Sequence, residues 1–192
     1  MAFWSENFAS GGKDPKRKFR FIVSFGNIAT PEGGPILWFA KTASKPSFQL
    51  GETTHDFLNH KFKYPGRVAW QDVTVTLVDP ADPDVAATLS DIVVAAGYSP
   101  PTNAYDLESM SKHSAVSALG TVTVSQLDDK GTPIETWTLW NAFISELKYG
   151  DLDYAGDDLT EVSVTLKYDW ARLETASESR SIHAGGKEFF KP

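Results

Sequence analysis

The stretch that decides the fold is residues 64–79, which read YPGRVAWQDVTVTLVD. A Pro-Gly pair is a strong turn signal, so residues 64–67 predict a turn. The residues after it alternate between apolar and polar, as in a strand with one buried and one exposed face. The apolar set is Val73, Val75 and Leu77, and the polar set is Asp72, Thr74 and Thr76.

A second strand of the same kind lies near the end of the chain, where residues 161–170 read EVSVTLKYDW. We expect one strand over 159–173, with Val162, Val164 and Leu166 on its apolar face. Strands of this kind leave sheet edges, and such edges must be covered or used for pairing.

The remaining chain predicts further strands, one helix and a long arm. Residues 45–64 hold apolar residues separated by polar ones, too few for a core of their own, so we expect a hairpin arm. The helix is predicted over 83–96, capped by Asp82, begun by Pro83 and closed by Gly97. Loops are expected at 30–35 and 98–110, and a hairpin turn at 128–131. The other predicted strands are 18–25, 36–41, 118–127, 134–144 and 146–154.

These elements predict a mainly β protein: an antiparallel β-sandwich or barrel of about seven strands, with one packed α-helix and an extended hairpin arm. We divide the chain into an N-terminal arm (1–16), a single β domain (17–173) and a C-terminal tail (174–192). The N-terminal arm contains Trp4 and Phe8, and aromatic residues in a polar arm indicate that it docks onto something. Phe189 and Phe190 could anchor the tail.

Composition narrows the class of protein. The chain has 192 residues, which is long enough to bury a core without help from disulfides or metal. It has no cysteine, so disulfides are excluded. It has no signal peptide pattern and no apolar run long enough to span a membrane, so we expect synthesis in a cytoplasm and no membrane partner.

Charge is unevenly distributed along the sequence. Residues 1–67 hold ten Lys/Arg and five Asp/Glu, whereas residues 68–192 hold eight and twenty. This is either a chance distribution or a dipolar subunit whose basic part meets the acidic part of a neighbour, a contact that generates rings or filaments.

No motif for catalysis is present, so we expect no enzyme, no cofactor and no catalytic residue. The spacing of His55 and His60 suits no metal site. The acidic stretch 151–157 lacks ligands that a calcium loop requires, so it is read as an acidic turn. Neither a phosphate-binding loop nor a nucleophile elbow occurs.

The order of these motifs resembles the tail tube proteins of contractile-tailed, T-even-like bacteriophages. The resemblance rests on the Gly-Arg turn, the strand beginning at Trp70 and the final VSVTLKYDW strand, and it covers about residues 17–171. It implies a structural subunit of the virion tail tube, six copies of which form a ring whose inner sheets join edge to edge. Stacked rings would conduct the genome during ejection, so DNA passes through without specific binding.

The resemblance also implies partners and assembly residues. Implied partners are further copies of the chain, the tail sheath, baseplate and tail terminator proteins, and a tape-measure protein. The arm would contact the adjacent ring, with Phe48, Leu50, Phe57, Leu58, Phe62 and Tyr64 as candidates. The polar set Asp72, Thr74 and Thr76 would line the channel wall or form its outer surface, and we hypothesise that the lumen is acidic.

Two other functions stay open from sequence alone. One is the tube protein of a related secretion or injection system, which would share the fold. The other is a monomeric carbohydrate-binding β-sandwich that uses Trp38, Trp70 or Trp140 as a stacking platform.

Overall fold

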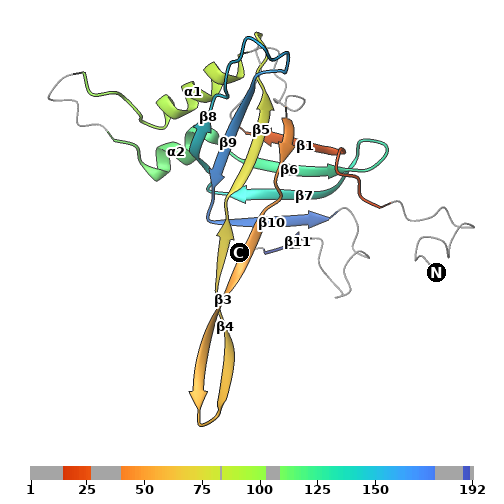
Figure 1. Cartoon of the computed structure of the whole chain (residues 1–192), viewed down its shortest axis with the longest axis vertical. Coiled ribbons are helices and arrows are strands. Elements are labelled where there is room, and N and C mark those ends of the chain that lie inside the picture. The colour runs from red at the N-terminus through yellow and green to blue at the C-terminus, as the bar shows by residue number, and fades with distance from the viewer. Residues whose placement is uncertain (1–14, 27–39, 83, 103–108, 176–187, 191–192) are drawn as a thin grey trace, which may run out of the picture.

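Two antiparallel sheets, two helices and a projecting hairpin make up the part of the chain that the computed structural model describes (Figure 1). The described residues are 15–26, 40–82, 84–102, 109–175 and 188–190. The mainly β, antiparallel fold expected from the sequence is confirmed. Within these ranges, no helix is long and apolar enough to cross a membrane.

The four-stranded sheet contains both stretches that the sequence singled out. Every neighbouring pair in it is antiparallel. In spatial order its strands are β2 (Ala40–Ala43), β5 (Val73–Val78), β9 (Glu161–Lys167) and β8 (Phe143–Lys148).

The second sheet has five strands, and in Figure 1 they run across the direction of the first sheet. In spatial order they are β1 (Phe21–Phe25), β6 (Val122–Leu127), β7 (Pro133–Trp140), β10 (Trp170–Thr175) and β11 (Glu188–Phe189). The turn predicted between β6 and β7 is present, because Asp128 Oδ1 accepts from the amides of Lys130 and Thr132 and Gly131 has a φ of 80°.

The hydrophobic core lies between the two sheets, as the alternation predicted. Val73, Val75 and Leu77 of β5 are fully buried or nearly so, and they face the matching residues of β9 in register. A fully buried apolar side chain contributes roughly 1.5–3 kcal/mol, so these two strands supply much of the stability. The rest of the cluster includes Val23, Phe25, Leu89, Leu119, Val122 and Leu139.

Two helices lie beside β8 in place of the single predicted one. The first, α1 (Val85–Ala95), is the expected helix, but its N-cap is Asp84 rather than Asp82. Asp84 Oδ1 accepts from Ala87 N, and Asp79 Oδ1 also accepts two amides of the first turn. Gly97 has a φ of 102°, in agreement with the predicted left-handed ending.

The second helix, α2 (Lys112–Leu119), was not predicted. Ser111 caps it by accepting from Ser114 N at 3.1 Å. The strand expected to begin at residue 118 therefore begins only at Val122 as β6. Only Ala115 and Leu119 of α2 are buried, so the sequence of this short helix shows almost no helical periodicity.

Two strands predicted as continuous each break and change sheet. The predicted strand 134–144 is β7 followed by β8, with Asn141 at a φ of 53° between them. The predicted strand 159–173 is β9 followed by β10, so Trp170 belongs to the other sheet. Asp169 ties the two corners together, since it accepts from Asn141 Nδ2 and from Lys112 Nζ, each at 2.7 Å.

Other predicted elements are shorter than expected or fall elsewhere. The first strand begins at Phe21 rather than residue 18, and no strand follows Lys148 before β9. The predicted strand 36–41 overlaps β2 only at Ala40 and Lys41, and its other residues lie outside the described ranges. Trp4, Phe8, Trp38, Pro83 and the loop 30–35 also lie outside them.

Candidate assembly surfaces

A long hairpin, β3 (Ser47–Phe57) and β4 (His60–Gln71), projects away from both sheets (Figure 1). The eleven residues of β3 give this strand a length of about 35 Å. The turn falls at Leu58 and Asn59, with Leu58 at a φ of 52°. The turn predicted at 64–67 is therefore wrong: these residues lie inside β4.

The Pro-Gly pair marks an irregularity in the hairpin instead of its turn. Pairing shifts register between Leu50 and Glu52, which face Val68 and Pro65. A Cβ placed on Gly66 would lie 3.0 Å from the backbone of Gly51, so the two strands approach closely because both residues are glycines. Proline lacks an amide to donate, which suits this break in the ladder.

The six arm residues proposed from sequence all lie on this hairpin and are exposed. Their exposed fractions run from 40% for Phe48 to 90% for Leu58. Large exposed apolar side chains gathered on one projection are typical of a surface that binds a partner, so these six residues stay candidates for assembly. In order along the chain they are Phe48, Leu50, Phe57, Leu58, Phe62 and Tyr64.

An aromatic cluster holds the root of the hairpin against the body. Phe48 packs edge-on against Trp70 at 5.1 Å between ring centroids, and Phe190 packs against both at 5.7 and 5.5 Å. Tyr168 packs on Trp70 and donates from Oη to the carbonyl of Gln71 at 2.8 Å. Burial raises the pKa of Tyr168 to about 12. Phe190 thus anchors the C-terminal segment at the root of the hairpin. The sequence predicts that Phe48 belongs to the arm, but it does not predict the contact between Phe48 and Phe190.

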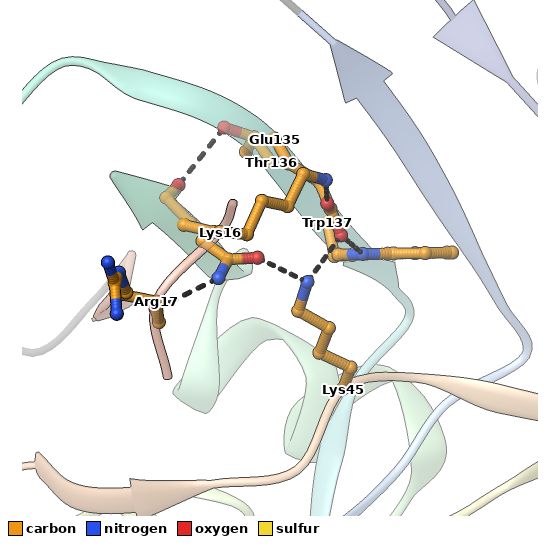
Figure 2. A network of polar contacts seen from close by, with 8 residues as sticks. Lys16, Arg17, Lys45, Glu135, Thr136 and Trp137 are labelled. Atoms are coloured by element: carbon orange, nitrogen blue, oxygen red, sulfur yellow. Dashed lines mark hydrogen bonds and ion pairs between the residues drawn. The ribbon is translucent and has the colours of Figure 1, made fainter. Parts of the chain in front are cut away.

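A buried carboxylate joins the hairpin to the N-terminal segment (Figure 2). The Glu135 side chain, 8% exposed, accepts from Lys16 Nζ, from Lys45 Nζ at 2.7 Å and from Trp137 Nε1 at 2.7 Å. Lys45 also donates to Gln126 Oε1 at 2.6 Å, and Gln126 Nε2 donates to the carbonyl of Arg17 at 3.1 Å. Burial, with the nearby charge of Lys16, lowers the pKa of Lys45.

This network could not be found from sequence. Glu135 stands at a strand position that reads as polar, and nothing local indicates that it is buried. Its two lysine partners are 90 and 119 residues away along the chain. The network fixes the start of β3, and with it the direction of the hairpin, relative to β7.

The face of the four-stranded sheet opposite the core is lined by hydroxyl groups and balanced charges. Thr74 pairs with Thr165, and Thr76 pairs with Ser163. Asp72 is exposed but lies between β4 and β5 rather than in a strand. The charged residues that alternation places on this face or at its edges are Lys41, Glu146, Lys148, Glu161 and Lys167, with ion pairs Lys41–Glu161 and Lys148–Glu146.

Both edges of this sheet are unpaired within the described residues, because no described strand adjoins the outer side of β2 or of β8. Four strands that alternate in direction give two edges that run in opposite directions. Identical copies placed edge to edge can therefore continue the antiparallel ladder.

The tryptophans suggested for sugar stacking have other contacts. Trp70 belongs to the root cluster, and Trp140 stacks on Trp170 with ring centroids 5.9 Å apart.

Two open sheet edges within the described residues, together with a long arm that exposes large apolar side chains, are features of proteins that assemble with copies of themselves. The chain belongs to the family of the T4-like virus tail tube protein gp19, whose model matches residues 17–172. It is therefore a structural tail tube subunit, part of a phage or phage-like injection particle. No curated protein matches it in sequence.

Solved structures with the same fold come from contractile injection systems. A chain of the anti-feeding prophage baseplate has a TM-score of 0.60 and 19% identity, covering 85% of this chain and 97% of that one. A chain from the PVC sheath/tube terminator of an extracellular contractile injection system has a TM-score of 0.60 and 20% identity, covering 85% and 99%. A chain of the PVC sheath–tube complex has a TM-score of 0.57 and 22% identity, covering 85% and 94%.

Proposed function

We propose that six copies close into a ring by pairing β8 of each copy with β2 of the next, so that their four-stranded sheets form one barrel around a channel. The observation that supports this most directly is the pair of open, oppositely directed edges on one sheet. Closure removes both edges, and a rotation that brings β8 onto β2 repeats until the ring is complete.

The polar face of the sheet then lines the channel. The other face is covered by the second sheet, so Thr74 and Thr76 face inward in such a ring. This wall carries hydroxyl groups and a near balance of charge, while the four acids of the 149–160 loop lie beyond the ends of the strands. We infer that such a nearly neutral wall, in place of the acidic one hypothesised from the sequence, would let a genome slide past without holding its phosphates.

In this arrangement the hairpin is the contact between stacked rings. It projects along the direction of β5 and β9, the strands of the wall (Figure 1). Its exposed apolar side chains would be covered by the adjacent ring.

Wider partners follow from the assemblies in which the similar chains occur. Those chains come from a baseplate, a sheath/tube terminator and a sheath–tube complex, which supports sheath, baseplate and terminator proteins as partners here. The proposal also includes a tape-measure protein inside the tube and passage of DNA without specific binding. It further includes docking of the N-terminal arm through Trp4 and Phe8, and synthesis in a host cytoplasm. A phage tail and a related injection system both fit it.

Negative-stain microscopy of the purified chain, with a hairpin-shortened variant beside it, tests the proposal. In the variant, residues 51–67 are replaced by Asn-Gly, a two-residue turn that joins Leu50 to its register partner Val68. We expect tubes from the parent chain, and single rings or short stacks from the variant. If the parent chain stays monomeric at high concentration and binds a sugar, the carbohydrate-binding function replaces the proposed tube function. Full-length tubes from the variant would show that the hairpin does not join rings.

A further inference from the structure

Strand pairing alone gives a small contact between neighbours in the proposed ring. The β2 edge has four residues and spans roughly 13 Å. A stable protein interface buries roughly 1,200–2,000 Å² in total. Surfaces beside the two edges must therefore contribute to the contact.

An apolar groove lies beside β8, between that strand and α1. Its volume is about 490 Å³. Val94, on the outer side of α1, is 61% exposed at this groove, and large apolar residues of the following loop are exposed beside it. The lining includes Val93, Val94, Tyr98, Met110, Leu147 and Tyr149.

A projecting phenylalanine lies on the opposite side of the subunit. Phe19, just before β1, is 75% exposed, and the guanidinium of Arg20 lies 5.5 Å from its ring centroid. Phe19 borders a hollow of about 850 Å³ between β1 and β2, which Lys18 and Lys41 also line. It thus flanks the β2 edge as the groove flanks the β8 edge.

The elements that carry these two features lie on opposite sides of the subunit in Figure 1: α1 and β8 on one side, and the start of β1 on the other. Pairing β8 of one copy with β2 of the next would bring the groove of the first against Phe19 of the second. Charge favours the same pairing. Three cations and no acid occur in residues 17–20, whereas the loop 149–160, which continues from Tyr149 in the groove lining, holds four acids and no cation.

We propose that Phe19 of one copy inserts into the groove between α1 and β8 of the next copy in the ring. This inference rests on the proposed ring and adds to it a lateral contact outside the barrel wall. The occupant is a second copy of this chain, because the groove lies beside one sheet edge and the phenylalanine beside the other.

Cysteine cross-linking tests the contact directly, since the natural chain has no cysteine. Phe19→Cys is combined with Val94→Cys or with Met110→Cys in the full chain, and assembled material is treated with a short bismaleimide. Phe19→Cys with Val68→Cys serves as the control, because Val68 is a similarly exposed valine on the hairpin. We expect ladders of covalent oligomers up to six chains from both groove pairs and few from the control.

The outcomes separate this contact from the ring itself. Tubes in which the groove pairs cross-link no better than the control would overturn the contact and leave the tube intact. A parent chain that forms neither rings nor tubes would overturn both. If only the cysteine variants fail to assemble, the assembly of the Phe19→Leu and Phe19→Ser variants is compared instead. Leucine should preserve assembly, whereas serine should raise the concentration needed for it roughly tenfold or more; equal assembly by the two would contradict the contact.

Discussion

Replacing Glu135 by glutamine tests whether one buried carboxylate holds the hairpin, β7 and the N-terminal segment together. The substitution preserves shape, so no cavity forms. It removes the charge that two ammonium groups share, and the new amide NH2 points toward one of those donors. Hydrogen bonds to charged groups contribute roughly 1.5–3 kcal/mol each.

The expected loss is smaller than the full value of both bonds. The side chains of Lys16 and Lys45 are about half exposed, so water restores part of their solvation. Trp137 Nε1 can still donate to the amide oxygen. We therefore expect a loss of about 2–3 kcal/mol, below the 3–5 kcal/mol typical of breaking a fully buried pair. For a chain of this size the loss lowers the melting temperature by roughly 5–10 °C.

Thermal and urea unfolding measure this loss, with Glu52→Gln as the matched control. Glu52 pairs with Lys63 at 3.2 Å on the exposed hairpin, where an ion pair contributes about 0–1 kcal/mol. Hydrogen exchange of the Ser47–Leu50 amides should also accelerate in Glu135→Gln alone. If the two variants lose equal stability, the Glu135 carboxylate does not organise the contacts drawn in Figure 2.

Three further predictions concern the hairpin and its root. Phe190→Ala removes a ring that contacts Phe48, Trp70 and Trp137, so urea unfolding should show a loss of about 1–3 kcal/mol; no change would mean that the chain end is not an anchor. Gly66→Val forces a Cβ against Gly51, so trypsin should cleave the hairpin faster and unfolding should lose about 1–3 kcal/mol, unlike Thr53→Val on the same hairpin. Because the pKa of Tyr168 is about 12, above its unfolded value near 10, the half-buried neutral phenol stabilises the fold below pH 10 and this contribution disappears as pH rises toward 12. Stability should therefore fall more steeply above pH 10 in the parent than in Tyr168→Phe, and identical pH profiles would count against burial of the phenol.

Alternation identified the wall strands correctly because one face of each is buried and the other is not. Val73, Val75 and Leu77 needed no knowledge of their partners to be placed in the core. The strand breaks at Asn141 and Tyr168 left no such signal, since apolar residues continue across both corners while the chain moves from one sheet to the other. The local pattern of apolar residues therefore indicates which side chains are buried, but not in which of the two sheets a strand lies.

The arm was recognised because its apolar residues are too sparse for a core, but its geometry was not. Pro65-Gly66 has turn chemistry and yet lies in a strand, where the glycine is needed for close approach to Gly51. The ring contacts of Phe190 and the ion pairs of Glu135 join residues far apart in the sequence, so no local pattern predicts them. The division at residues 16 and 173 stays a prediction, although β10 continues to Thr175 and pairs with β11.

The projecting hairpin of β3 and β4 has a consequence for any tube whose rings stack through it. Rings that stack through an arm on one face only form a polar filament, whose two ends differ chemically. At one end six arms stay uncovered, and at the other the surface that receives them is vacant. A capping protein for the first end must supply a binding surface, and one for the second must supply an arm or a substitute for it. The two ends therefore require different terminating proteins, and elongation has a direction set by the subunit.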